Sequence, residues 1–151
     1  MRVIIQRVLS SSVTIDGNLF SSIDHGLLVL LGVTEEDGPE DVDYLAHKIA
    51  QMRIFGDREG KMNLSVLDVQ GEVMVISQFT LFAQTKKGNR PSFILAARPD
   101  KAIPLYESFL HKMDMITMKK TACGVFGADM KVELINDGPV TIFIDSKQKD
   151  L

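Results

Sequence analysis

Cysteine and histidine are both scarce in this chain of 151 residues. Cys123 is the only cysteine, so the chain can form no internal disulfide and no thiolate cluster for a metal. The histidines are His25, His47 and His111, and neither HExxH nor any other ligand spacing of histidine and cysteine occurs. We therefore expect no metal site.

Long hydrophobic runs and phosphate-binding loops are also missing. The longest strongly apolar stretch, residues 26–33, is much shorter than the ~18 residues that a membrane span requires. The first residues contain no long apolar region followed by a cleavage site, which predicts a first strand and a cytoplasmic protein. Neither GxGxxG nor GxxxxGK[ST] occurs, which excludes the phosphate-cradling loops of nucleotide-binding folds.

An excess of positive charge is absent as well. The formal net charge is −3, which disfavours a protein that coats nucleic acid through many phosphate contacts. It remains compatible with a protein that binds only the end of an RNA. Lys86, Lys87 and Arg90 form one cluster of candidate phosphate contacts, and Lys119 and Lys120 form another. A solvated loop or strand face is the alternative interpretation of each cluster.

The pattern of apolar residues predicts a single mixed α/β (α+β) domain over residues 1–151. Alternating or continuous apolar runs indicate about eight strands. Turn signals such as Asp16-Gly17 predict mostly antiparallel pairing in a curved, barrel-like sheet with two helices packed on one side. The tail, residues 146–151, is polar and is predicted to fray. The predicted strands cover residues 2–8, 12–15, 19–23, 26–33, 72–78, 116–122, 130–135 and 140–145.

Two segments have the period of an amphipathic helix. The first begins near Pro39, where proline suits the first turn. The second covers roughly residues 100–113, although Pro104 removes a backbone donor from its first turns. The apolar positions of the first helix are Val42, Leu45, Ala46, Ile49 and Met52.

Polar side chains follow the buried strand at residues 72–78. The segment Ser77-Gln78-Phe79-Thr80-Leu81 offers hydroxyl and amide groups where the strand emerges, and such groups can point into a cleft. From these five residues alone, hydrogen bonding in a turn or at a strand end is the favoured interpretation. No GxSxG motif and no Ser-His-Asp spacing occurs, so a conventional serine hydrolase is disfavoured.

The segment NDGPVT, residues 136–141, permits two interpretations. Asp137-Gly138 between two strands is a common hairpin turn. Pro139 cannot donate to a sheet, so it suits either the first position of a strand or a peptide bond of special geometry, such as a cis bond.

Several motifs in order resemble the D-aminoacyl-tRNA deacylases. The motifs are SQFTL at Ser77, KKGNRPSF at Lys86, FGADM at Phe126 and NDGPVT at Asn136. QRV, SVT, GLLVLLGV and KMNLSV, which begin at Gln6, Ser12, Gly26 and Lys61, are also similar to that family. The resemblance extends from residue 1 to about residue 144, and the pairing of SQFTL with NDGPVT is its most specific part.

The resemblance implies a cofactor-free homodimer that hydrolyses the ester of D-aminoacyl-tRNA at its 3′ aminoacyl-adenosine end. Ser77, Gln78, Phe79 and Thr80 would line the catalytic pocket. Gly138 and Pro139, joined by a cis peptide, would enter the partner's pocket and exclude L side chains. The resemblance further implies that Arg7 orients this dipeptide, and that Phe126 and Met130 form part of an adenine-binding wall.

Three functions remain open at this point. The first is the deacylase, which would also act on glycine carried by the wrong tRNA because glycine has no side chain to exclude. The second is a catalytically silent dimer that binds the end of an RNA. The third is a related deacylase for a small L-amino acid.

Overall fold

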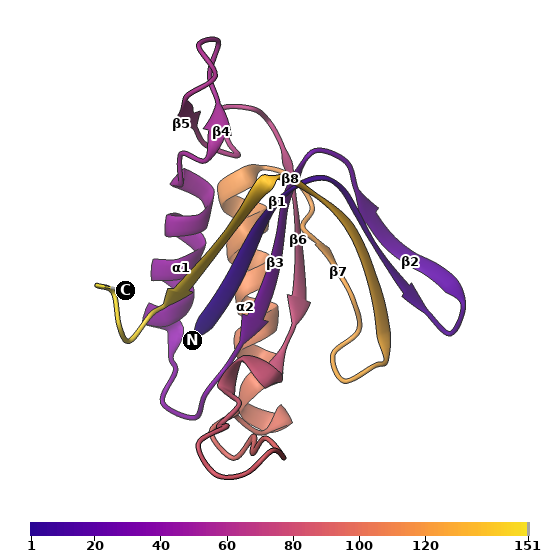
Figure 1. The fold of residues 1–151 in the computed structure, drawn as a ribbon, viewed down its shortest axis with the longest axis vertical. Coiled ribbons are helices and arrows are strands. Elements are labelled where there is room, and N and C mark those ends of the chain that lie inside the picture. The colour runs from indigo at the N-terminus through magenta and orange to yellow at the C-terminus, as the bar shows by residue number, and fades with distance from the viewer. Residues whose placement is uncertain (151) are drawn as a thin grey trace.

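A curved six-stranded sheet forms the centre of the protein, in a computed structural model that describes residues 1–150 (Figure 1). The predicted mixed α/β domain is confirmed. The strands are β1 (Arg2–Ile15), β2 (Asn18–Ile23), β3 (Gly26–Gly32), β4 (Phe55–Gly56), β5 (Met62–Leu64), β6 (Glu72–Ser77), β7 (Ala122–Cys123) and β8 (Met130–Asp145). The helices are α1 (Pro39–Gln51), the short 3₁₀ helix η1 (Phe79–Phe82) and α2 (Pro99–Thr117).

Strand β1 organises the sheet because it pairs with three other strands. It is antiparallel to β2, β3 and β8, whereas β3–β6 and β6–β7 are parallel pairs. The order β2-β1-β3-β6-β7 curves until its two end strands approach each other. There the Ser21 hydroxyl donates a hydrogen bond to the Cys123 carbonyl at 2.6 Å. The sheet is thus nearly closed, as the predicted barrel-like curvature requires.

Two apolar cores lie on opposite sides of this sheet. The larger lies between the sheet and the two helices, which cover the same face (Figure 1), and includes Ile5, Leu45 and Phe109. The smaller fills the inside of the curved sheet and includes Val8, Leu28 and Met74. The alternation of side chains along each strand divides the apolar residues between the two cores.

The two predicted helices are present. Helix α1 begins at Pro39, its apolar stripe is buried, and Gly38 N–H donates to the Asp41 carboxylate at 2.9 Å. Helix α2 begins at Pro99 and continues through Pro104 to Thr117. The burial of its apolar side therefore outweighs the backbone donor that Pro104 removes.

The predicted strand at residues 116–122 is wrong. Residues Ile116 and Thr117 form the end of α2, and β7 begins only at Ala122. Met113 is fully buried in the larger core, and Thr117 donates its hydroxyl hydrogen to the Met113 carbonyl at 2.8 Å. Tertiary packing thus overrides the strand preference of the β-branched residues.

Two pairs of predicted strands are each a single long strand. Residues 2–8 and 12–15 both belong to β1, and residues 130–135 and 140–145 both belong to β8. The predicted hairpin at Asp137-Gly138 is therefore wrong, because β8 continues along β1 for its whole length. The hairpin at Asp16-Gly17 is confirmed, with φ angles of 51° and 78° in the two turn residues.

The segment after β8 is bound to the body of the protein at its start. The Ser146 hydroxyl donates to the Asp41 carboxylate at 2.5 Å and accepts from the buried amino group of Met1 at 2.9 Å. Lys147 Nζ donates to Asp41 at 2.9 Å. Ser146 and Lys147 are thus attached, while Leu151, the end of the tail predicted to fray, lies outside the described residues. Within residues 1–150, no helix is long and apolar enough to cross a membrane.

Candidate active site

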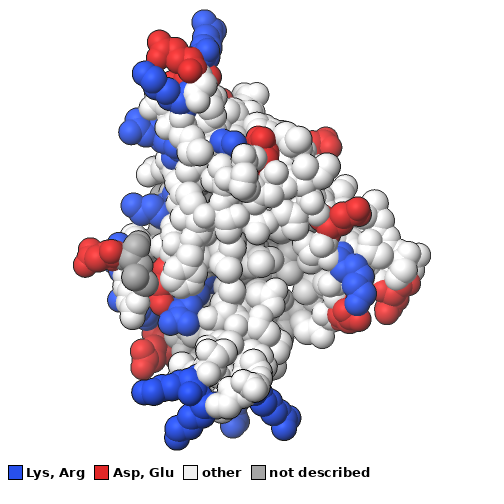
Figure 2. Space-filling model, viewed as in Figure 1, with Lys and Arg blue, Asp and Glu red and all other residues white. Residues whose placement is uncertain are grey.

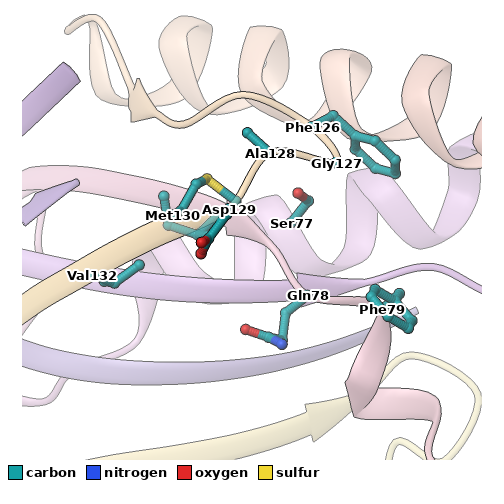
Figure 3. A pocket seen from close by; sticks show the side chains of 10 residues that line it. Ser77, Gln78, Phe79, Phe126, Gly127, Ala128, Asp129, Met130 and Val132 are labelled. Atoms are coloured by element: carbon teal, nitrogen blue, oxygen red, sulfur yellow. The ribbon is translucent and has the colours of Figure 1, made fainter. Parts of the chain in front are cut away.

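A cavity of about 250 Å³ opens where β6 ends. Its floor belongs to the smaller core, and its two walls come from the end of β6 and from the loop that leads into β8 (Figure 3). The residues that line it are Ile76, Ser77, Gln78, Phe79, Phe126, Gly127, Ala128, Asp129, Met130 and Val132.

The burial of β6 explains why polar groups gather at its end. Residues 73–76 are buried, and the chain leaves the sheet immediately after Ser77. Gln78 N–H donates to the Leu31 carbonyl at 2.7 Å, which fixes the exit point against β3. Figure 3 shows the Ser77 hydroxyl directed towards the loop that carries Gly127.

Helix η1 leaves two backbone donors uncommitted within its own turn. Its first hydrogen bond is donated by Leu81 N–H to the Gln78 carbonyl at 3.3 Å. The N–H groups of Phe79 and Thr80 precede that bond, so they have no acceptor within the helix. The Gln78 side-chain amide donates to the Thr80 hydroxyl, which ties the two polar side chains together.

The opposite wall is supported by helix α2. The Tyr106 ring lies 6.0 Å from the Phe126 ring, and the Tyr106 hydroxyl donates to the Val75 carbonyl of β6 at 2.7 Å. Burial raises the pKa of Tyr106 well above its ordinary value, so the hydroxyl keeps its hydrogen. Tyr106 thereby connects both walls to the larger core.

Gly138 and Pro139 protrude from β8 and are exposed. Their peptide bond is cis, which confirms the prediction of special geometry. The register against β1 jumps between Gln6 and Val8, which leaves the dipeptide outside the ladder. The Asn136 side-chain oxygen accepts from Val140 N–H at 2.8 Å and closes the bulge.

Arg7 lies against this bulge and is largely buried. Its Nε donates to the Asp137 carbonyl at 2.9 Å and is 3.3 Å from the Asp137 carboxylate. Its Nη1 donates to the Ile54 carbonyl at 2.6 Å. These contacts fix the residue that precedes Gly138.

The structure brings only some of the predicted site residues together. Ser77, Gln78, Phe79, Phe126 and Met130 line one cavity, and Thr80 is hydrogen-bonded to Gln78. The bulge that carries Gly138 lies elsewhere, because β8 runs extended from Met130 to Asn136. Six residue steps at ~3.3 Å each separate those two residues by about 20 Å.

The predicted phosphate contacts lie outside the cavity. Lys86, Lys87 and Arg90 are exposed on the connection between η1 and α2. Among residues 1–150, no group of three or more histidine, cysteine, aspartate or glutamate side chains has the arrangement of a metal site.

The prediction from sequence missed several residues of both sites. Gly127, Ala128 and Asp129 line the cavity, while Asn136 and Asp137 hold the bulge. All five belong to the motifs FGADM and NDGPVT. Membership of those motifs was the signal that could have identified these residues, because their spacing alone indicates no chemistry.

Comparison with known proteins places this geometry in a family. The model of the family described as D-Tyr-tRNA(Tyr) deacylase matches residues 4–145. A D-aminoacyl-tRNA deacylase of Flavobacterium johnsoniae is 57% identical over 99% of this chain and all of its own length.

Two solved structures have the same fold. One, a c-Myc DNA unwinding element binding protein, is 40% identical with a TM-score of 0.91, over 96% of this chain and 98% of its own. The other, a probable eukaryotic D-amino acid tRNA deacylase, is 15% identical with a TM-score of 0.81, over 95% of this chain and 97% of its own, and supports the fold alone. The matches to the family model and to the bacterial relative establish that this chain belongs to the D-Tyr-tRNA(Tyr) deacylase family.

Proposed function

We propose that the protein hydrolyses the ester bond of D-aminoacyl-tRNA and releases free D-amino acid and tRNA. The observation on which this depends is the cavity at the end of β6, where the family motifs SQFTL and FGADM form facing walls. The names of the relatives support the same reaction. A cytoplasmic location is part of the same proposal, because the substrate is a charged tRNA.

The chemistry is addition of water to the ester carbonyl, followed by release of the ribose oxygen. The carbonyl oxygen becomes an oxyanion, and the N–H groups of Phe79 and Thr80 are the donors proposed to stabilise it. No histidine lines the cavity. In line with the resemblance to the deacylases, which implies a role for the substrate's own ribose, we assign the proton transfer to the 2′-hydroxyl next to the ester. The protein contributes alignment and oxyanion stabilisation.

The active form is proposed to be a homodimer. The face of the sheet opposite the helices shows a broad area without charged side chains (Figure 2). Leu9 and Ile135 are 52% and 56% exposed on the adjacent strands β1 and β8, and Phe143 of β8 is 43% exposed. Large exposed apolar side chains in an area without charges are typical of an interface.

The dimer would bring Gly138 and Pro139 into the cavity of the partner. Their own cavity is out of reach along β8, whereas an exposed bulge beside an apolar face can enter a second copy. Its backbone would face the α-carbon of the bound amino acid and occupy the space that an L side chain requires. D-amino acids and glycine leave that space empty, so both would be substrates.

The reaction is tested with purified tRNA charged with D-tyrosine and, separately, with L-tyrosine. We expect rapid release of D-tyrosine and retention of the L ester. Hydrolysis of both would support an esterase and contradict the exclusion of L side chains. Hydrolysis of the L ester alone would favour the related L-deacylase, and release of neither by a folded dimer would favour the silent RNA-end-binding protein.

Sharing of sites between chains is tested by mixing two inactive variants. Gly138→Ala impairs the bulge, and Ala128→Trp fills the cavity of its own chain. A mixed dimer contains one intact cavity that faces one intact bulge. After random exchange of chains, we expect about a quarter of the wild-type activity. No recovery in a mixture that forms mixed dimers would contradict the shared site.

A further inference from the structure

The connection between η1 and α2 differs in charge from the rest of the chain. No aspartate or glutamate occurs between residues 73 and 99, while Lys86, Lys87, Arg90 and Arg98 all lie there. The whole chain has a net charge of −3, so the residues outside this segment together carry a net negative charge. A positive segment in an acidic protein indicates an anionic partner for that segment.

Three of these cations lie on one short loop. Gln84 and Ser92 exchange two backbone hydrogen bonds, of 2.8 and 3.0 Å, which close the loop that contains Lys86, Lys87 and Arg90. We call residues 85–91 the cationic tip. Figure 2 shows basic side chains gathered at the lower end of the molecule, where Figure 1 places this connection.

The charges of the cationic tip have no acidic partner within the part of the chain that the structure describes. The ion pairs of residues 1–150 involve the amino group of Met1, Arg2, Arg7 and other lysines, and none involves Lys86, Lys87 or Arg90. All three are exposed. They are thus available to phosphate groups.

An aromatic pair joins the cavity to this region. Phe79 lines the cavity and packs edge-on against Phe93, with their ring centres 5.1 Å apart. Phe79 is 55% exposed, and the neighbouring Ile94 is 79% exposed. Phe93 lies two residues after the cationic tip in the chain, so apolar and aromatic surface extends from the cavity mouth towards the basic loop.

We propose that the cationic tip binds the sugar–phosphate backbone of the single-stranded RNA immediately upstream of the terminal nucleoside in the cavity. Phe79 and Phe93 contact the bases between the two sites. This inference rests on the proposed function, which puts the 3′ end of an RNA in the cavity. Cations beside exposed aromatic rings are the combination that binds single strands without reading their sequence.

The test compares two sets of charge-neutralising substitutions. One variant combines Lys86→Gln, Lys87→Gln and Arg90→Gln. The control combines Arg53→Gln, Arg58→Gln and Lys61→Gln, which removes the same charge from exposed residues near the β4–β5 hairpin at the opposite end of the molecule (Figure 1). Each protein is assayed on D-tyrosyl-tRNA and on D-tyrosyl-adenosine, which has no upstream phosphate.

We expect the tip variant to lose on the order of tenfold in kcat/KM on D-tyrosyl-tRNA, mainly through KM, and to keep its rate on D-tyrosyl-adenosine. Its dependence of log(kcat/KM) on log salt should be shallower by about 2, because each phosphate contact in a single strand contributes roughly 0.7. The control variant should match the wild type on both substrates. Equal losses in both variants, or a loss on D-tyrosyl-adenosine, would overturn the proposal.

A binding measurement tests the cationic tip independently of the proposed hydrolysis. The affinity of each protein for an uncharged single-stranded RNA oligonucleotide is measured by fluorescence anisotropy, which requires no hydrolysis. Weaker binding by the tip variant alone would support the cationic tip even if the wild type hydrolysed neither ester. Unchanged affinity, or a tip variant that loses its dimeric state instead, would refute it.

Discussion

The helix-covered face of the sheet contrasts sharply with the exposed surface of β1 and β8. The helix-covered face is closed by fully buried side chains such as Phe109 and Met113. Strands β1 and β8 instead leave Leu9, Ile135 and Phe143 exposed, and β8 carries the exposed bulge. Substitutions under the helices should therefore destabilise the protein, whereas substitutions in the exposed bulge should leave it folded and inactive.

The largest effect on stability is expected from Phe109→Ala. Phe109 is fully buried between α2 and the sheet, so its removal should lower the free energy of unfolding by about 3–5 kcal/mol. Urea denaturation measures this change. The rate per folded molecule should stay close to that of the wild type, and a selective loss of activity would contradict this contrast.

Gly138→Ala should have the opposite effect, a loss of activity with little change in stability. A Cβ on Gly138 would lie 2.7 Å from Val140 Cγ2 and 2.8 Å from Val140 N, at a φ of +147°. The bulge must shift, and we expect about a 100-fold loss of D-ester hydrolysis with a Tm close to that of the wild type. Single-turnover kinetics and calorimetry measure the two quantities. Full activity of the Gly138→Ala variant would show that the bulge is not part of the active site.

Thr80→Ala should have a moderate effect on activity. It deletes the hydroxyl that accepts from the Gln78 amide, a contact of about 1 kcal/mol, so the rate should fall roughly fivefold. Thr80→Ser keeps the acceptor and serves as the control, with nearly full activity. If both Thr80→Ala and Gly138→Ala leave turnover unchanged, the catalytic pocket is assigned wrongly.

The smallest expected effect is a loss of stability in acid. For Asp41, burial raises the pKa, but hydrogen bonds from Ser146, Lys147 and Gly38 outweigh it and lower the pKa overall. For Asp145, burial again raises the pKa, and Arg2 and Lys147 N–H reverse the shift.

A lowered pKa in the folded state stabilises the protein above the pKa of the unfolded chain. This contribution is lost as pH falls through the folded pKa, so stability should decrease below about pH 4. Urea midpoints between pH 3 and 7 measure it. Asp41→Asn should reduce the fall of the urea midpoint at acidic pH. Asp150 is exposed, so the control Asp150→Asn should not change it.

Local patterns predicted the helices and the buried strands well. The spacing of Val42, Leu45 and Ile49 defines a helix face whatever surrounds it, and the apolar run of β3 permits little except a buried strand. The two main errors were non-local. Ile116 stays helical because α2 packs along the sheet, and Asp137-Gly138 does not turn because β1 is long enough to pair with β8 on both sides of it.

The candidate site was predicted in its residue types but not in its assembly. Ser77 and Gln78 stood out because polar groups follow a buried strand. Nothing in their spacing indicates that residues 126–130 form the facing wall, because that contact depends on the path of the chain after α2. The resemblance supplied this pairing, and it could not supply the Tyr106 hydroxyl that ties α2 to the backbone of β6.

The pairing of β1 with β8 also has a consequence for folding during synthesis on the ribosome. These strands occupy the two ends of the chain, and every residue of β8 is made after the rest of the sheet. At roughly 5–20 residues per second, one edge of β1 waits several seconds on the ribosome for its partner. An unpaired strand edge is a template for aggregation, so the nascent chain is exposed to aggregation during that interval.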